Sequence, residues 1–163
     1  MAKLLTIQIG ENNPMLRTAS VPVKKFDAVL KKFAKEMRET MIKLDGLGLA
    51  APQVGENIRM IAVTMNYGSK NASVTIMINP EILSHGDETE VAEEGCLSLP
   101  GTYGKVERYK NIVVAFTDID GEKYVLKLAE LNARVVQHET DHLNAVLFID
   151  RIKQSKKKNA VIM

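Results

Sequence analysis

The sequence predicts an α+β fold in which antiparallel sheets pack around one central helix, with an amphipathic helix nearer the N-terminus. Three observations lead to this class: a long stretch of helical periodicity, a series of short apolar stretches that includes a hairpin, and a second helical stretch near the end of the sequence. No repeat or linker divides the sequence. We therefore expect residues 1–163 to form a single domain with its own core.

The first helix is expected over residues 24–44, where apolar residues recur at intervals of three and four. Its opposite side is rich in lysine, but Glu36 and Glu39 interrupt this basic face, which favours a solvated surface over a nucleic-acid contact. Asp45 and Gly46 form a turn signal that ends the helix. A short strand is expected before this helix, over residues 4–9.

The middle of the sequence has the composition of strands. Residues 58–65 are mostly apolar, and residues 73–79 form a second stretch that closes at Asn79 and Pro80. Residues 81–84 are compatible with an extension of the same sheet. The clearest hairpin signal consists of residues 112–119 and 122–128, which flank a turn at Asp120 and Gly121.

The overall composition is that of a soluble globular protein, with 45% hydrophobic and 26% charged residues. A net charge of +2 and the absence of tryptophan argue against a protein that binds polyanions or stacks bases, so we expect no direct nucleic-acid role. No apolar run approaches the roughly 20 residues of a membrane span, and the first residues do not resemble a signal peptide. We therefore expect a cytoplasmic protein without a membrane contact.

The second helical stretch carries a pair of histidines, His138 and His142. At this spacing on a helix both imidazoles leave the same face and can bind one metal ion. Glu139 lies beside the first histidine, where a carboxylate can move protons to and from a metal-activated water. The alternative is a solvated helix face, but the flanking residues 133–136 and 145–149 are mostly apolar. We therefore predict that the central helix binds a metal ion.

Two other stretches carry candidate site residues. Cys96 is the only cysteine, so it is either a small buried hydrophobic residue or a thiolate that acts as a metal ligand or a nucleophile. Residues 46–55 are rich in glycine and alanine, and Gln53 is their one side chain able to donate and accept hydrogen bonds. This stretch lacks the third glycine of a dinucleotide-binding loop, so it is either a connecting loop or a segment whose backbone approaches a ligand closely. His85, in a polar stretch, is expected to be exposed and without a role.

Three segments together resemble the signature motifs of the peptide deformylases, in order and in approximate spacing. They are Gly46-Leu47-Gly48-Leu49-Ala50-Ala51-Pro52-Gln53, Glu94-Gly95-Cys96-Leu97-Ser98 and Gln137-His138-Glu139-Thr140-Asp141-His142-Leu143. Residues 15–17, 21–23 and 147–151 are also similar to the family, so the resemblance spans nearly the whole chain. It implies an enzyme that removes the formyl group from the N-terminal methionine of nascent polypeptides, in bacteria or in organelles of bacterial origin.

The resemblance implies that Cys96, His138 and His142 hold one divalent metal ion. In this family the ion is usually ferrous iron, and zinc, nickel or cobalt can replace it. Three protein ligands leave a fourth position for water, as a catalytic site requires. A metalloprotease is the rival interpretation, because it shares the histidine spacing. Such enzymes, however, use a carboxylate or a third histidine in place of the cysteine.

The resemblance also assigns the chemistry and the contacts with an N-formylmethionine peptide. Glu139 would be the general base and then the general acid, while the Gln53 amide and the Leu97 backbone N–H would stabilise the oxyanion. Gly48 and Leu49 would pair with the peptide backbone. The candidates for the methionine pocket are Leu47, Val135 and His138, of which Val135 is equally well explained as a core residue.

Three features depart from the commonest family pattern or stay open. Ala145 stands where the family commonly has glycine, so a positive φ there would strain the chain. Tyr103 stands near the place of an arginine found in some branches, and Arg108 is a weaker candidate for the substrate contacts of that arginine. Residues 151–158 are basic and form either a solvated tail or, as in some deformylases, a contact with the ribosome.

Overall fold

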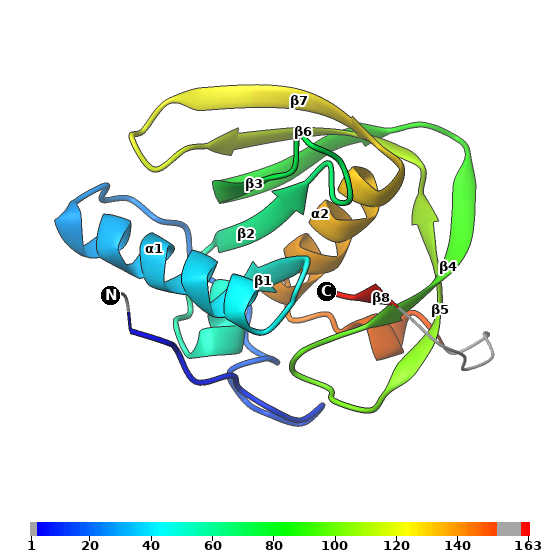
Figure 1. The fold of residues 1–163 in the computed structure, drawn as a ribbon, viewed down its shortest axis with the longest axis horizontal. Helices are drawn as coiled ribbons and strands as arrows, with labels where there is room; N and C mark the ends of the chain where they lie inside the picture. The colour runs from blue at the N-terminus through cyan, green and yellow to red at the C-terminus, as the bar shows by residue number, and fades with distance from the viewer. Residues whose placement is uncertain (1–2, 153–160) are drawn as a thin grey trace.

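The computed structural model describes residues 3–152 and 161–163 of the chain (Figure 1). In these residues the strands form two sheets, one with the order β1-β2-β3-β6-β7 and one with the order β5-β4-β8. Neighbouring strands are antiparallel except for β4 and β8, which are parallel. The predicted α+β class with antiparallel sheets is confirmed. The strands are β1 (Gly48–Ala50), β2 (Met60–Met65), β3 (Ser73–His85), β4 (Thr89–Gly95), β5 (Tyr103–Tyr109), β6 (Asn111–Thr117), β7 (Lys123–Ala129) and β8 (Val161–Ile162).

Helix α1 spans Ala28–Lys43 and packs against β1, β2 and β3. It begins at Ala28 rather than at residue 24, because the Asp27 carboxylate accepts a hydrogen bond from the Leu30 N–H (3.0 Å) and caps the helix there. Met37 and Met41, on the side facing the sheet, are fully buried. The helical periodicity therefore located the packed face only in part, since Val29 (75% exposed) and Leu44 (43%) of the same apolar series face solvent, and the capping residue decided the boundary.

The strand predicted over residues 4–9 is wrong, because this segment is irregular. Its backbone groups bond to groups outside any strand. The Leu5 N–H donates to the Thr40 hydroxyl of α1 (2.9 Å), and the Gln8 N–H donates to the Gln53 carbonyl (2.7 Å). The side-chain pattern resembled a strand, but no strand pairs with this segment within residues 3–152 and 161–163.

Strand β3 continues through Asn79 and the proline after it, where the sequence predicted an end. Its register with β6 shifts at this point and Asn79 has a φ of 51°, so a bulge accommodates a residue that lacks an N–H. The Asn79 side chain fixes the bulge by accepting from the Val23 N–H (2.8 Å) and donating to the Val23 carbonyl (2.9 Å). The predicted hairpin is confirmed as β6 and β7, with the Asp118 carboxylate accepting two backbone hydrogen bonds in the turn.

Strands β4, β5 and β8 were not predicted. Strands β4 and β5 are rich in charged residues and lack a long apolar run, yet they pair along their whole length. Strand β8 joins β4 after residues 153–160, which lie outside the described part of the chain. Most of the basic stretch 151–158, for which a ribosome contact was considered, is therefore also outside the described residues.

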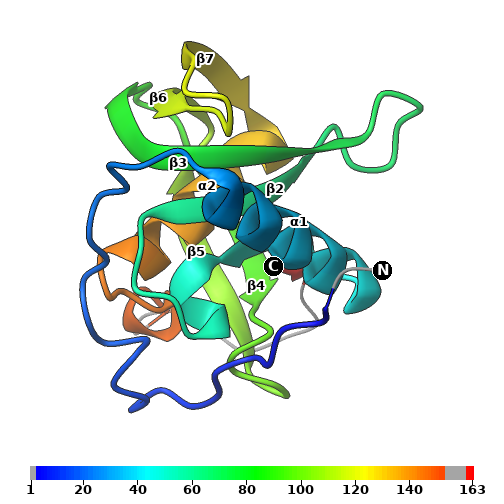
Figure 2. The same ribbon diagram turned by 90° about the vertical axis from the view of Figure 1, so that its left-hand side faces the viewer.

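Helix α2 spans Glu130–Leu143 and lies between the two sheets (Figures 1 and 2). Every residue from Ala133 to Leu143 is buried, including the charged ones. Buried polar groups need partners inside the protein, so the side chains of this helix must be satisfied by the surrounding strands or by a ligand. None of the described helices is both long and apolar enough to span a lipid bilayer.

Candidate metal centre

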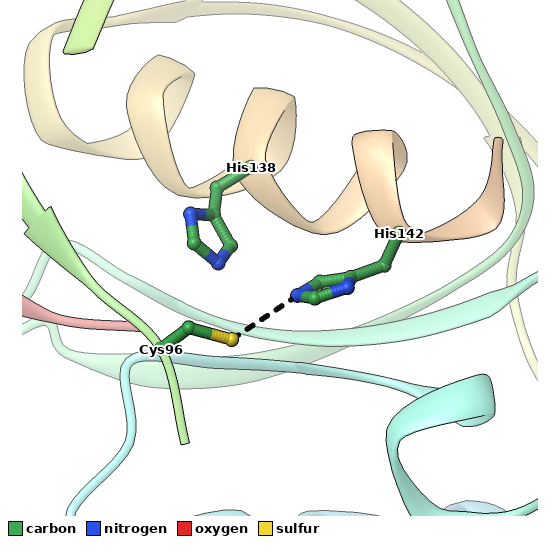
Figure 3. A group of neighbouring side chains, drawn as sticks. All are labelled: Cys96, His138 and His142. Atoms are coloured by element: carbon green, nitrogen blue, oxygen red, sulfur yellow. Dashed lines mark hydrogen bonds between the residues drawn. The ribbon is translucent and has the colours of Figure 1, made fainter. Parts of the chain in front are cut away.

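Cys96, His138 and His142 come together in one buried cluster between the two sheets (Figure 3). Cys96 directly follows β4, and the two histidines lie on successive turns of α2. Their potential ligand atoms all lie within 4.8 Å of one another, and the Cys96 Sγ is 3.4 Å from the His142 Nε2. The three predicted metal ligands, which are far apart in sequence, are thus placed around one point.

The hydrogen bonds of His138 fit a bound cation. Its Nδ1 lies 2.8 Å from the Glu94 Oε1, and since a carboxylate only accepts, this nitrogen carries the proton. Its Nε2 is buried and has no hydrogen-bond partner among the described residues. The lone pair of Nε2 is therefore free to bind an ion together with the Cys96 Sγ and the His142 Nε2.

The protein environment moves the pKa of the two histidines in opposite directions. Burial lowers the pKa of His138, but the neighbouring Cys96 thiol and the hydrogen bond with Glu94 outweigh this and raise the pKa to about 10. Burial and the charge of His138 hold the pKa of His142 well below its ordinary value. Because metal ligation requires the lone pairs of both imidazoles, an ion must displace any proton on the His138 Nε2, and its binding depends on pH.

Glu94 supports the cluster from inside the smaller sheet. It accepts hydrogen bonds from the Arg108 Nε (2.9 Å) and Nη2 (2.8 Å) and from the Arg134 Nη1 (2.7 Å), besides its contact with His138. Burial raises the pKa of Glu94, but Arg108 and His138 outweigh it, so the net pKa is far below its usual range. Glu94 is thus an ionised, fully buried residue; the family motif includes it, but the sequence did not reveal its role, because its partners Arg108 and His138 are distant in the chain.

Arg108 also forms an ion pair with Asp141, near the C-terminal end of α2. Its Nη1 donates to the Asp141 Oδ2 (2.6 Å), and Arg151 donates to both oxygens of the same carboxylate. Only 4% of Arg108 is exposed, so its guanidinium is used inside the protein. This position does not support the substrate contacts considered for Arg108. Tyr103, the other residue considered there, begins β5 and lies against Gly95.

Glu139 is fully buried beside the cluster. Neither of its carboxylate oxygens has a hydrogen-bond partner in the described part of the chain, and burial raises its pKa to about 7. Gly48 of β1 packs directly against it, because a Cβ at position 48 would collide with the Glu139 carboxylate. A carboxyl group with this pKa can accept or release a proton near neutral pH.

Gln53 faces the cluster from a short 3₁₀ helix, Ala51–Val54, that follows β1. Its side-chain oxygen accepts from the Ala50 N–H (2.8 Å), which turns the amide nitrogen towards the Cys96 Sγ (3.4 Å) and the Ser98 hydroxyl (3.1 Å). Gln53 is fully buried. Residues 46–55 are therefore more than a connecting loop, since they place both a strand edge and a fixed amide donor beside the cluster.

The remaining predicted residues lie around this centre. Leu97 directly follows the cysteine, and Leu47 and Val135 are buried in one core cluster. Leu49 points the other way, into a second core cluster with α1, so only its backbone remains available to a ligand. His85 is exposed and stacks on Tyr109, with the ring centroids 3.6 Å apart, and it is not part of the centre.

Known proteins similar to this chain match it over nearly its whole length. Residues 6–158 match the family model of polypeptide deformylase. The peptide deformylase of Thermotoga maritima is 48% identical over 145 residues, which cover 89% of this chain and 85% of that protein. That of Endomicrobium trichonymphae is 42% identical over 159 residues, which cover 98% of this chain and 92% of that protein.

Solved structures share the fold. The crystal structure of peptide deformylase from Thermotoga maritima matches with a TM-score of 0.86 at 46% identity, covering 93% of this chain and 99% of that chain. A class I type b peptide deformylase from Acinetobacter baumannii, bound to Met-Ala-Ser, matches with a TM-score of 0.86 at 36% identity. This second match covers 93% of this chain and 100% of that chain.

The cluster contains a cysteine sulfur beside two helical histidines, which the rival interpretation as a metalloprotease does not explain. The match to the family model and the identity with its members cover most of the sequence. The chain therefore belongs to the polypeptide deformylase family, metal-dependent hydrolases that remove the formyl group from the N-formylmethionine of nascent polypeptides.

Proposed function

We propose that deformylation by this chain takes place at the buried cluster, where Cys96, His138 and His142 hold one divalent ion. The observation that carries this proposal is the buried Nε2 of His138. This atom lies beside the Cys96 Sγ and the His142 Nε2, and no group in the described part of the chain forms a hydrogen bond with it. An imidazole whose Nδ1–H is held by Glu94 is already oriented for binding a cation through its other nitrogen.

The ion proposed is ferrous iron, with zinc, nickel or cobalt as substitutes, because a thiolate with two imidazoles suits each of them. When bound, such an ion supplies a Lewis acid that lowers the pKa of water from 15.7 toward about 7. The protein contributes the ligand set, the buried surroundings and the hydrogen bond that fixes His138.

Glu139 is proposed as the group that takes the proton from the attacking water and returns it to the leaving amine. Its carboxyl is buried and has a pKa of about 7, so both the charged and the neutral form are accessible at neutral pH. The amine needs this proton because a peptide nitrogen cannot leave as an anion. One carboxyl group therefore serves as base in the first step and as acid in the second.

Two fixed donors are proposed to stabilise the negative charge that develops on the formyl oxygen. The first is the Gln53 side-chain amide, whose nitrogen is directed towards Cys96 because its oxygen is held by the Ala50 N–H. The second is the backbone N–H of Leu97. Donors that are already oriented need no rearrangement during the reaction, which is why they lower its barrier.

The substrate backbone is proposed to pair with Gly48 and Leu49 as an added strand, because β1 is an edge strand of its sheet. The methionine side chain is proposed to enter a pocket formed by Leu47, Val135 and His138. Leu47 and Val135 are both buried, so this pocket has apolar walls. The close approach of Gly48 to Glu139 leaves little room, which favours the small formyl group over larger acyl groups.

We also propose a cytoplasmic location in a bacterium, because the substrate is a nascent polypeptide. A ribosome contact through residues 151–158 rests on the basic composition of that stretch alone.

Formate release from formyl-Met-Ala-Ser, with metal analysis of the same sample, tests the proposed function. Glu139→Gln should retain the metal and lose about 10²–10⁴-fold in turnover, because the variant cannot transfer the proton. The matched control is Glu130→Gln on the same helix, where the Glu130 side chain is 65% exposed, and it should keep normal turnover. Normal turnover of Glu139→Gln would refute the acid and base role of this residue.

A further inference from the structure

The segment Val161–Met163 lies beside the metal cluster and connects the two sheets. Strand β8 pairs with the end of β4, next to Glu94 and Gly95. On its other side the Ile162 carbonyl accepts a hydrogen bond from the Leu47 N–H (3.4 Å), immediately before β1. Figure 1 shows β8 in red between β1 and β4. This segment therefore fills the space between an edge strand of each sheet.

The same space is needed by the substrate in the proposed binding mode. One edge of β1 is paired with β2, and one edge of β4 is paired with β5 along the whole strand. A peptide that pairs with Gly48 and Leu49 must use the outer edge of β1, and on reaching Leu97 it meets the edge of β4 that β8 occupies. Val161–Met163 and a substrate peptide therefore cannot occupy this groove together.

Met163 lies at the groups proposed to bind a formylmethionine, namely the apolar pocket residues and the Leu97 N–H. Met163 is 0% exposed and belongs to the same core cluster as Leu47 and Val135, two residues of the proposed methionine pocket. Its carbonyl accepts from the Leu97 N–H (3.4 Å), which is one of the two proposed oxyanion donors. A methionine of the chain itself therefore lies in the core cluster that contains two residues of the proposed pocket, and it occupies a proposed oxyanion donor.

The hydrogen bonds at the end of this segment are long enough for a bound peptide to replace it. Its backbone hydrogen bonds with Leu47, Gly95 and Leu97 measure 3.3–3.4 Å, longer than the usual distance of about 2.9–3.0 Å. The packing is close, since a Cβ on Gly95 would lie 2.7 Å from the Ile162 Cδ1. Shape complementarity and the short ladder with β4 therefore hold the segment in the groove, while the three long hydrogen bonds at its end leave this end replaceable by a better-paired peptide.

We infer that Val161–Met163 is an internal competitor of the substrate, which occupies the peptide groove and must leave before a formylmethionine peptide binds. This inference rests on the proposed function, because it identifies the groove by the residues proposed to bind the peptide. A methionine side chain is flexible and polarisable, so it fits an apolar pocket built for methionine. The occupied fraction lowers the apparent affinity for substrate without changing the chemistry of the open form.

Steady-state kinetics with formyl-Met-Ala-Ser tests the inference. Met163→Ala should lower KM roughly threefold or more and leave kcat unchanged, because a smaller side chain fills the pocket less well. The control is Met65→Ala in the same core cluster, where Met65 is 8% exposed and belongs to β2; it should lose stability without a fall in KM. An unchanged or higher KM for Met163→Ala overturns the inference, whereas the absence of formate release from every form, unsubstituted protein included, would refute the proposed function.

A binding measurement on the unsubstituted chain avoids the effect of a substitution on folding. With ¹³C-methyl methionine in the zinc-loaded protein, the Met163 methyl signal is assigned as the one missing from Met163→Ala. Saturation with the product peptide Met-Ala-Ser should move this signal to the position of a solvent-exposed methionine. If it stays in place while the amide signals of Gly48 and Leu49 report bound peptide, the segment is a fixed part of the fold and the inference is wrong.

Discussion

The Oε1 atom of Glu94 lies 2.8 Å from the Nδ1 atom of His138, and both residues are buried. Arg108 and Arg134 donate to the same carboxylate, so Glu94 stays ionised and acts only as an acceptor. His138 must therefore carry a proton on Nδ1, so its Nε2, beside the cysteine and the other histidine, is the atom that can bind an ion once its own proton is displaced. A residue of β4 thus sets the tautomer of a residue on α2.

Replacement of Glu94 by glutamine should weaken metal binding. The variant loses the anion that orients His138, and such a loss costs about 10–100-fold in metal affinity. It should also lower the melting temperature, because Arg108 and Arg134 keep their buried positive charges without this counter-charge. Competition between the protein and a chelator for zinc, measured well below the melting temperature, gives the affinity.

Glu90→Gln is the matched control for this experiment, because Glu90 lies on the same strand with an exposed side chain. It should leave both the zinc affinity and the melting temperature near those of the unsubstituted protein. Equal zinc affinities for Glu94→Gln and the control would show that the contact with His138 does not orient the ligand.

Replacement of Gly48 by alanine should reduce activity strongly. The added Cβ would collide with the Glu139 carboxylate, so either this side chain or β1 must move. A displacement of about 1 Å at a catalytic group can cost about 100-fold in rate, and we expect a loss of kcat/KM of that order. Gly86→Ala is the control, because a Cβ there would meet its nearest atom at 3.6 Å. Activity of Gly48→Ala close to that of the control would place Glu139 outside the chemistry.

The N-cap of α1 should make stability depend on pH at the acidic end. The hydrogen bond from the Leu30 N–H lowers the pKa of Asp27, so the folded state favours the ionised form. This contribution is present above the unfolded pKa of about 3.9 and is lost as the pH falls through the lower folded pKa. Asp27→Asn keeps a capping side chain that does not titrate.

Urea denaturation of both proteins between about pH 6 and pH 3 measures this contribution. The free energy of unfolding of the unsubstituted protein should fall relative to that of Asp27→Asn as the pH decreases. A constant difference over the whole range would mean that the Asp27 carboxylate adds no pH-dependent stability.

The sequence predicted the elements whose apolar residues recur with a helical or strand period. It failed where hydrogen bonds with residues distant in the sequence determine the structure. The periodicity of α1 and the hairpin of β6 and β7 are local signals, and both elements are present. Residues 4–9 alternate like a strand, but their hydrogen bonds go to Thr40 and Gln53. Strand β8 is too short for a period to be visible, and it exists only because the edge of β4 is available.

The metal cluster was predictable because the histidine spacing is a local helical pattern and the cysteine motif resembles that of a known family. The buried ion pairs that hold Glu94 beside this cluster were not predictable. Glu94, Arg108 and Arg134 are separated in sequence, and only the pairing of β4 with β5 and the packing of α2 bring them together. Their charges, read from the sequence alone, would have suggested a solvated surface.

Replacement of Ala145 by glycine should stabilise the protein. Ala145 has a φ of 61° and follows the last turn of α2, where its N–H donates to the His142 carbonyl (3.2 Å) and the Val146 N–H donates to the Asp141 carbonyl (2.9 Å). This is a Schellman motif, in which the left-handed position favours glycine because a Cβ there is strained. The strain considered for Ala145 from the sequence is thus located at the exit of the metal-binding helix.

Glycine removes this strain but also has a larger entropy in the unfolded chain, so the net gain should be about 1 kcal/mol, or roughly 2–4 °C in melting temperature. Ala28→Gly serves as the control, because Ala28 is an exposed residue in the first turn of α1 without a positive φ. The same exchange should lower the melting temperature there, since only the entropy cost remains. Thermal unfolding of both variants decides the point: a fall in melting temperature for Ala145→Gly would mean that the left-handed alanine costs less than the freedom that glycine gains on unfolding.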